Sequence, residues 1–265
     1  MDHARIAELL EPFLGPPGDR RLSTGDLDRI SRYIDLLLRW NARMNLTAIR
    51  DPEEIVTRHF GESFFLARHL FPDPARMERT LLSAPALSQP SAQSGISTTS
   101  SREDDSNPAA RSSKLVIDIG SGAGFPALPV KIWAPEIHLT MIESNHKKAA
   151  FLREAARALT LTNVNVITER AESIAARLSK PNGPGASTHP PHSQFPPPDA
   201  VTFRAVEKFD QILPVAVSLL APDATMAILI TESQRTHLQT IQSMKWNIIS
   251  VPESHTRELA LGTHA

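Results

Sequence analysis

Apolar residues follow two different spacings along the chain. Up to Leu70 they recur every three or four positions, which is typical of helices that bury one face. From Leu115 onward, short runs rich in valine and isoleucine alternate with stretches of helical spacing. Such runs indicate strands covered on both faces, and their alternation with helices indicates a doubly wound, mostly parallel sheet. We therefore expect an α/β fold with an N-terminal helical extension.

The expected helices of this extension are 6–14, 25–43 and 53–70. Ser23 or Thr24 is suited to cap the second helix, and Pro52 is suited to the first turn of the third. His59 is a minor candidate for function, because a lone histidine in such a helix is usually packed and hydrogen-bonded. A row of arginines on the second helix is either a solvated face or a contact to RNA phosphates: Arg29, Arg32, Arg39 and Arg43.

The later pattern predicts five strands that alternate with helices, followed by an antiparallel pair. The expected strands are 115–119, 138–143, 163–168, 199–203 and 225–230, and the closing pair is 246–251 with 258–261. The expected helices between them are 126–134, 146–159 and 209–219.

Two segments lack apolar periodicity. Residues 72–113 are rich in serine, proline, alanine and threonine, and residues 180–198 are rich in proline. Segments of this composition bury too little apolar surface to offset the entropy of ordering. We expect both to be flexible insertions, the first of which separates a helical region at 1–71 from an α/β domain at 114–265.

Composition excludes several classes of protein. The chain of 265 residues has no cysteine, so disulfides and thiolate metal sites are excluded, and its ten histidines show no metal-binding spacing. No apolar run is long enough to span a membrane, so we expect a soluble cytoplasmic protein with no membrane contact. A formal net charge of −1 gives no global attraction to nucleic acid, so any RNA contact must come from local patches.

The clearest chemical signal is the segment K-L-V-I-D-I-G-S-G-A-G-F, Lys114–Phe125. Its glycines, Gly120, Gly122 and Gly124, follow a buried strand and precede a helix, where they allow positive φ and close approach of a ligand. The spacing is G-x-G-x-G, whereas the dinucleotide fingerprint is G-x-G-x-x-G. The turn therefore predicts a nucleotide-type ligand, although many such turns are only tight connections.

Two acidic residues narrow the choice of ligand. Asp118 precedes the first glycine, where a carboxylate would repel a pyrophosphate but suits an ammonium group. Glu143 follows the second strand, where a ribose-binding acid is expected, although an acid in a solvated loop is the alternative. S-adenosyl-L-methionine carries an ammonium and no phosphate, so we favour it over NAD. Ala171 and Glu172 follow the third strand and are placed to meet the adenine; Glu172 is otherwise a first-turn acid of the next helix.

Several segments together resemble the RsmG (GidB) family of small-subunit ribosomal RNA guanine-N7 methyltransferases. They cover most of the chain outside the two low-complexity segments: Tyr33–Pro52 (Y-I-D-L-L-L-R-W-N-A-R-M-N-L-T-A-I-R-D-P), Arg58–Ser63 (R-H-F-G-E-S), Val116–Pro129 (V-I-D-I-G-S-G-A-G-F-P-A-L-P), His146–Leu152 (H-K-K-A-A-F-L) and Phe203–Val206 (F-R-A-V). The W-N-x-x-x-N-L-T segment and the extended glycine turn are fairly specific to the family.

This resemblance implies a class I methyltransferase-like fold and methyl transfer from S-adenosyl-L-methionine to N7 of one guanine in bacterial 16S rRNA. The implied partner is 16S rRNA or the 30S subunit, and the expected state is a monomer. The positions that match the family's cofactor-binding residues are Gly120, Ser121, Gly122, Phe125, Glu143, Ala171, Glu172 and Arg204.

Arg204 also matches the active-site arginine of the family. Guanine N7 already carries a lone pair, so the reaction needs no base and depends on positioning. Arg204 is expected to contact an RNA phosphate, the guanine O6 or the cofactor carboxylate; the alternative is an exposed charge at a strand end.

The chain departs from the family at two positions. His146 stands where a glycine is usual, and Glu232 lies in a segment that often reads Lys-Gly. Three other functions stay open: a methyltransferase with another substrate, an NAD-dependent oxidoreductase, and an RNA-binding or assembly protein without catalysis.

Overall fold

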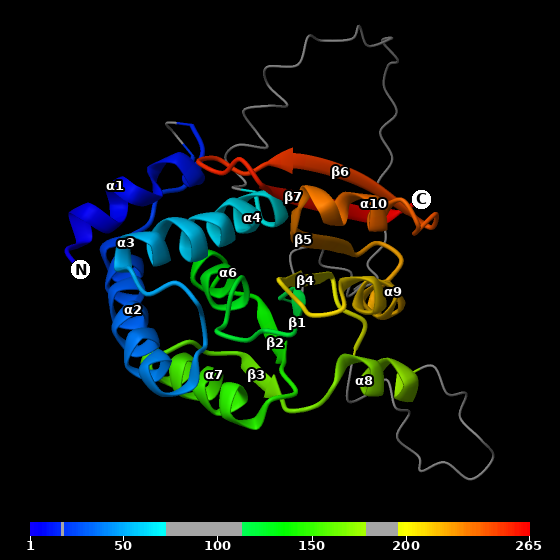
Figure 1. Ribbon diagram of the computed structural model, residues 1–265, viewed down its shortest axis with the longest axis horizontal. Helices are drawn as coiled ribbons and strands as arrows, with labels where there is room; N and C mark the ends of the chain where they lie inside the picture. The colour runs from blue at the N-terminus through cyan, green and yellow to red at the C-terminus, as the bar shows by residue number, and fades with distance from the viewer. Residues whose placement is uncertain (17–18, 73–112, 179–195) are drawn as a thin grey trace, which may run out of the picture.

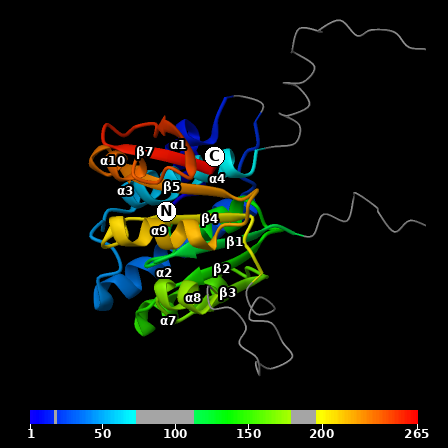
Figure 2. The same cartoon turned by 90° about the vertical axis from the view of Figure 1, so that its right-hand side faces the viewer.

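The computed structural model describes residues 1–16, 19–72, 113–178 and 196–265 (Figure 1). Its centre is a seven-stranded sheet with the order β3-β2-β1-β4-β5-β7-β6. The strands are β1 (Leu115–Ile119), β2 (His138–Ile142), β3 (Val164–Ile167), β4 (Ala200–Arg204), β5 (Thr225–Thr231), β6 (Met244–Ser250) and β7 (Arg257–His264). Figure 2 shows most of them side by side, from β3 at the bottom to β7 at the top.

Strands β1 to β5 pair in parallel, and β7 pairs antiparallel with both β5 and β6. The order reverses next to β1, where β2 lies on one side and β4 on the other. In an open parallel sheet, the crevice above such a reversal is where ligands bind. The doubly wound sheet and its antiparallel closing pair confirm the expectation from the sequence, and the arrangement is that of a class I methyltransferase-like fold.

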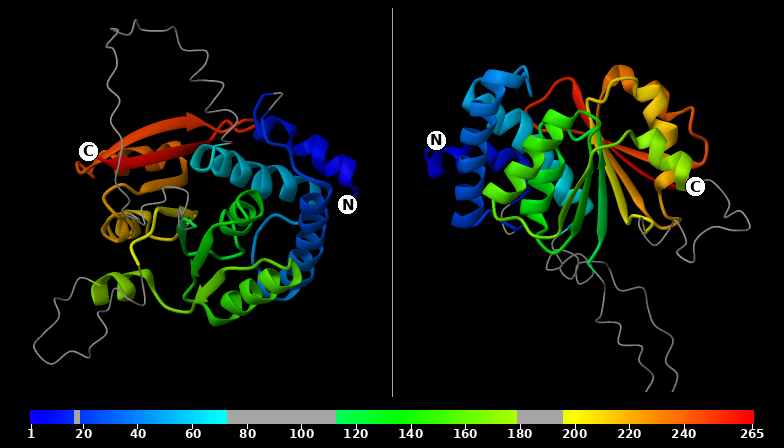
Figure 3. Two further views of the ribbon diagram at one scale, coloured as in Figure 1. Left: turned by 180° about the vertical axis from the view of Figure 1, so that it is seen from behind. Right: turned by 90° about the horizontal axis from the view of Figure 1, so that it is seen from below.

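The N-terminal helices cover one face of the sheet together with two later helices. They are α1 (His3–Leu14), α2 (Thr24–Met44), α3 (Pro52–Glu54), the π-helical segment η1 (Ile55–Gly61), α4 (Glu62–Leu70), α6 (Ala127–Trp133) and α7 (His146–Ala158). The opposite face is covered by α8 (Ala171–Leu178), α9 (Phe209–Leu219) and α10 (Arg235–Leu238), with the short η3 (Glu232–Gln234) before α10. The right-hand view of Figure 3 shows these two layers on either side of the strands.

Side chains from successive strand residues enter different cores, as the pleat requires. In β1, Val116 packs into the core beneath the N-terminal helices, whereas Ile117 and Ile119 pack into the core beneath α8 and α9. This explains why β1 carries apolar residues on both faces, with Asp118 as its one buried charged residue.

Local signals account for the start of α2. Ser23 accepts a hydrogen bond from the amide of Asp26, and the Asp26 carboxylate accepts one from the amide of Ser23, which makes a capping box. Ser23 is therefore the N-cap rather than Thr24. The arginine row is partly neutralised, because Arg29 pairs with Asp26 and Arg32 pairs with Asp28.

The expected helix at 53–70 is divided into three parts. After one turn of α-helix, the backbone widens into the π-helical segment η1 and then returns to the α-helix α4. The apolar spacing of this region does not distinguish the two forms. π-Helical turns are rare and frequently lie at functional sites.

The N-terminal helices and the sheet share one hydrophobic core in the structure. The division into a helical region at 1–71 and a domain at 114–265 nevertheless stays a prediction. Nearly all of the two low-complexity segments, residues 73–112 and 179–195, lies outside the described residues. No helix within the described part of the chain is long and apolar enough to span a membrane.

Tyr33 joins α2 to the glycine turn. Its side chain is fully buried, and its ring stacks on Phe125 at 5.3 Å and meets the edge of Phe60 at 5.4 Å. Its hydroxyl donates a hydrogen bond to the backbone carbonyl of Ala123, inside the turn. Burial also raises the pKa of Tyr33 well above its usual value, so the hydroxyl remains a donor at neutral pH. A helix residue thus fixes the turn that follows β1.

We predict that Tyr33→Phe lowers the free energy of unfolding by about 1–3 kcal/mol, because the Ala123 carbonyl loses its partner. Urea denaturation of the full chain measures this. Ser218→Ala, which removes an exposed hydroxyl bonded within its own helix, is the control and should cost less than about 0.5 kcal/mol. Equal effects of the two substitutions would contradict the structural role given to Tyr33.

Candidate active site

A cleft of about 920 Å³ lies at the carboxyl ends of β1, β2, β3 and β4. It is lined by the glycine turn after β1, the acid and cap residues after β2, the start of α8 and the loop after β4. The loop after α2 and the segment η1 contribute the remaining wall. Four separate βα connections and the N-terminal region therefore meet at one place.

Two glycines of the turn have different reasons to be glycine. Gly122 has a φ of +55°, and a Cβ there would face open space, with the nearest atom, the carbonyl oxygen of Gly120, at 3.7 Å. Gly124 has a φ of +84°, but a Cβ there would collide with the Tyr33 hydroxyl and with Leu128. Gly122 therefore borders the cleft and leaves room for a ligand, whereas Gly124 permits the packing of the helical layer and does not line the cleft.

Ser121 and Phe125, also expected at the cofactor site, both line the cleft. The Ser121 hydroxyl donates to the backbone carbonyl of Asp118 at 3.2 Å, which helps to close the turn. The Phe125 ring stacks on the imidazole of His59, with the ring centres 4.7 Å apart.

Asp118 lies beneath the turn and is fully buried. Thr202 donates to its Oδ1 at 2.6 Å, while its Oδ2 has no hydrogen-bond partner among the described residues. Burial, together with a smaller effect of the nearby Glu143, raises the pKa of this carboxyl to about 7 against the lowering effect of its hydrogen bonds. Asp118 is not among the residues that line the cleft, so the contact with a cationic ligand group that the sequence suggested stays a prediction.

Glu143 is also buried, so the alternative of a solvated loop acid is wrong. Its Oε2 accepts the amide of Gly122 at 2.9 Å and its Oε1 accepts the amide of Asn145 at 2.7 Å. Each carboxylate oxygen retains a second lone pair. The carboxylate therefore joins the turn after β1 to the start of α7 and still offers acceptors to the cleft.

Ala171 and Glu172 form the first turn of α8 and line the cleft. Glu172 thus occupies both of the places proposed for it, the cleft wall and the helix N-terminus. The two positions that depart from the family are His146 and Glu232. Neither is one of the described residues that line this cleft.

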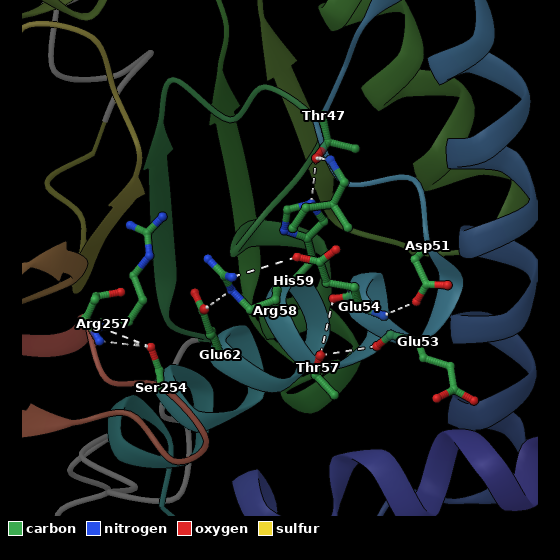
Figure 4. Close-up of polar contacts among 12 residues, drawn as sticks. Thr47, Asp51, Glu53, Glu54, Thr57, Arg58, His59, Glu62, Ser254 and Arg257 are labelled. Carbon is green, nitrogen blue, oxygen red and sulfur yellow. Dashed lines mark hydrogen bonds and ion pairs between the residues drawn. The ribbon is translucent and has the colours of Figure 1, made fainter.

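Arg204 ends β4 with its side chain only 6% exposed, so the alternative of an exposed strand-end charge is wrong. Its Nη2 lies 2.9 Å from Oε2 of Glu62, whose side chain is 1% exposed. Arg58 approaches the other oxygen of the same carboxylate, with Nε 3.2 Å from Oε1 (Figure 4). Burial lowers the pKa of Arg204 to about 10, so the guanidinium keeps its charge at neutral pH.

His59 extends this cluster toward the loop after α2. Its Nδ1 lies 3.2 Å from Nη1 of Arg204, and its Nε2 lies 2.8 Å from Oγ1 of Thr47, as Figure 4 shows for the second contact. Burial and the neighbouring Arg204 lower the pKa of His59 to about 3, so the imidazole is neutral at physiological pH. The residue kept as a minor candidate from the sequence is therefore in the site.

Two residues of the site were not singled out from the sequence, Glu62 and Thr47. Both lie in segments that carried the family resemblance, R-H-F-G-E-S and N-L-T. Arg204, the partner of Glu62, is about 140 positions away from it in sequence, and it is linked to Thr47 only through His59. The two family motifs were therefore the signal that pointed to Glu62 and Thr47. The spacing of residues alone was not sufficient to place them in the site.

We predict that Glu62→Ala lowers the free energy of unfolding by about 3–5 kcal/mol, because it leaves the buried Arg204 charge without a partner. Glu54→Ala is the matched control, since Glu54 pairs with Arg58 at 3.8 Å and is largely exposed; it should cost less than about 1 kcal/mol. Urea denaturation of both variants measures this difference. A Glu62→Ala protein as stable as Glu54→Ala would show that the Glu62–Arg204 pair contributes nothing to stability.

We predict that the free energy of unfolding depends on pH through the protonation of His59. Its pKa is lower in the folded chain than in the unfolded chain, so the unfolded state binds more protons as the pH falls below about 6.5. The wild type should therefore lose stability relative to His59→Gln between about pH 6.5 and pH 4, by up to about 1.4 kcal/mol per pH unit. Urea titrations at several pH values measure this difference, with the exposed His138→Gln as control. A difference that does not change with pH would contradict a buried neutral imidazole.

Comparison with known proteins places the chain in a family. The family model described as "GidB: rRNA small subunit methyltransferase G" matches residues 26–75 and 105–260. The chain is 33% identical over 199 residues to "Ribosomal RNA small subunit methyltransferase G" of Chloroflexus aggregans, which covers 75% of this chain and 61% of that protein. It is 31% identical over 222 residues to the protein of the same name from Xanthomonas axonopodis pv. citri, which covers 82% of this chain and 77% of that protein.

The chain spans about half to three fifths of the length of the first two curated relatives. Among solved structures, an rRNA methylase from Streptococcus thermophilus matches 58% of this chain and 87% of its own, at 11% identity and a TM-score of 0.42. That similarity is too distant to support an argument, whereas the family model and the relatives cover most of this chain. The chain belongs to the family of rRNA small subunit methyltransferase G.

Proposed function

We propose that this protein transfers the methyl group of S-adenosyl-L-methionine to N7 of a guanine in bacterial 16S rRNA. The observation that carries the proposal is the cleft at the reversal point of the sheet, with Gly122 open toward it and the buried acid Glu143 in its wall. Family membership supports the class of substrate.

The residues of the cleft fit this cofactor in chemical type. The free lone pairs of Glu143 suit the ribose hydroxyls. Asp118 does not line the cleft, but its unpartnered Oδ2 suits the ammonium group in chemical type. Gly120, Ser121, Gly122 and Phe125 would border the cofactor, and Ala171 with Glu172 would lie at the adenine. When bound, S-adenosyl-L-methionine supplies a methyl group on a positively charged sulfur.

The chain has to provide positioning rather than proton transfer. Guanine N7 is an acceptor with a free lone pair, so no base is needed to prepare it. His59 is correspondingly a poor base, because its pKa is about 3. The ion pair with Glu62 holds Arg204 at the end of β4, and a guanidinium has five N–H donors, so some remain for a substrate.

The cleft wall carries cations that RNA binding would use, next to four acids, Glu143, Glu169, Glu172 and Glu207. Several positively charged side chains line the cleft: Arg58, Lys148, Arg170, Lys208 and Arg257. These local cations matter for RNA binding because the whole chain, with a net charge of −1, has no general attraction to RNA phosphates. We propose 16S rRNA or the 30S subunit as partner, a monomeric enzyme, and the bacterial cytoplasm as its location.

The direct test is to express the gene in a bacterial strain that lacks its own family member and to map N7-methylguanine in 16S rRNA. We predict one new methylated guanine with the wild type and none with Gly122→Val, because a branched side chain resists positive φ and fills the cofactor space. Gly25→Val is the matched control, since a Cβ at Gly25 has room and its nearest contacts are at 3.7 and 3.8 Å. Circular dichroism and calorimetry with S-adenosyl-L-methionine show whether Gly122→Val is folded and has lost binding.

Other outcomes separate the competing functions. Methyl transfer to another base or to a protein would mean that the protein uses the proposed cofactor on a different substrate. Tight binding of S-adenosyl-L-methionine with no methylation of any component would favour an RNA-binding or assembly protein. Binding of NAD instead would contradict the proposal altogether.

A further inference from the structure

The loop after α2 presents Thr47 to the cleft in a fixed orientation. Helix α2 ends with Asn45 in the left-handed conformation, at a φ of +49°. The buried Asn41 side chain then holds Thr47 from both sides, since its amide donates to the Thr47 carbonyl at 2.9 Å and its oxygen accepts the Thr47 amide at 3.0 Å. Thr47 lines the cleft. Within the W-N-x-x-x-N-L-T segment, Asn41 therefore fixes the backbone of Thr47, and Thr47 presents its side chain to the cleft.

The hydrogen bonds around Thr47 determine the direction of its hydroxyl hydrogen. A guanidinium only donates, so the contact between Arg204 Nη1 and His59 Nδ1 makes Nδ1 the acceptor. The neutral imidazole therefore carries its hydrogen on Nε2, which donates to Oγ1 of Thr47 at 2.8 Å. The amide of Ile49 donates to the same oxygen at 3.1 Å.

Two donors therefore occupy both lone pairs of the Thr47 oxygen. The hydroxyl has only its own hydrogen left to offer, and none of the described residues accepts it. A cleft-lining group that can donate but cannot accept discriminates between ligands by their acceptor atoms.

We propose that the Thr47 hydroxyl donates a hydrogen bond to O6 of the substrate guanine and thereby selects guanine against adenine. This inference rests on the proposed function. N7 and O6 are neighbouring acceptors on one edge of guanine, whereas adenine has an N6 amino donor where guanine has O6. An amino group there would face a hydroxyl that has no lone pair to offer.

The position of Thr47 in the cleft favours the base over the cofactor. The groups suited to the cofactor, Gly122 and Glu143, lie at the ends of β1 and β2. Thr47 is connected instead through His59 to Arg204 at the end of β4. The side chains of Glu62, Arg204, His59 and Thr47 thus contact one another in series, from a buried acid to one hydroxyl on the side of the cleft that we assign to the substrate.

The test compares Thr47→Val, Thr47→Ser and Thr57→Val. Valine keeps the shape of threonine without the hydroxyl, and serine keeps the hydroxyl. Thr57 is the matched control, because its hydroxyl bonds only to carbonyls of the preceding turn. The guanine methylated by wild type is mapped first, which tests the proposed function separately, and particles are then reconstituted with guanine or 2-aminopurine at that position. 2-Aminopurine retains N7 and lacks O6.

On guanine, Thr47→Val should reduce kcat/KM for the particle by about ten- to a hundredfold, the scale for loss of one hydrogen bond to an enclosed polar group. Affinity for S-adenosyl-L-methionine should stay within about twofold, Thr47→Ser should recover most of the loss, and Thr57→Val should match wild type. On 2-aminopurine, wild type and Thr47→Val should be equally slow, because the partner of the hydroxyl is absent.

A merely structural role for Thr47 would reduce transfer to both bases by the same factor, and that result would overturn the inference. It would also fail if Thr47→Val transferred methyl to guanine as fast as wild type, or if the variant lost cofactor affinity instead. In each of these three cases the mapped methylation by wild type would leave the proposed function intact.

Discussion

The ion pair between Glu62 and Arg204 is the interaction on which the site depends. It joins the N-terminal helical layer to the end of β4, and both side chains are almost completely removed from water. A buried charge is tolerated only when its partner is in place, so the two elements cannot shift independently without a large penalty. The carboxylate also receives Arg58, and the guanidinium also reaches His59. One buried acid therefore organises three cationic or imidazole groups at the substrate side of the cleft.

A second link acts on the cofactor side of the same cleft. Tyr33 from α2 fixes the Ala123 carbonyl, and its ring packs on Phe125, which in turn stacks on His59. The glycine turn, the imidazole and the N-terminal helices are thus in continuous contact. This explains why the resemblance to the family was carried by helical motifs as well as by the glycine turn. The helices form part of the wall of the site.

The sequence predicted the elements well because the periodic signals are local. The β-branched run before Gly120 and the Ser23 cap both depend on nearby residues, and the structure confirms them. The insertion of β7 between β5 and β6 was not predicted, because the order of strands depends on pairing between distant segments. The π-helical form of residues 55–61 was also not predicted, since apolar spacing is compatible with both helix types.

The site was predicted in part for the same reason. Gly122 and Glu143 follow strands, so their position at one sheet edge followed from the expected topology, and Asp118 lies near the end of β1. The role of Glu62 and Thr47 depends on contacts with Arg204 and His59 that only the folded chain provides. Gly124 belonged to the same glycine pattern as Gly122, but its neighbours are Tyr33 and Leu128 rather than open space. A pattern of glycines does not by itself tell which ones border a ligand.

Hydrogen exchange of the free protein and of the protein saturated with S-adenosyl-L-methionine tests the central claim most directly. We propose that the cleft above the reversal of the sheet holds this cofactor. We predict slower exchange with the cofactor in peptides that contain 119–125, 142–148 and 169–172, which include most of the residues that line the cleft. Peptides from β6 and α10, among the described parts of the chain away from the cleft, should be unchanged. Slowed exchange confined to segments outside the cleft, or none at saturating cofactor, would contradict the account.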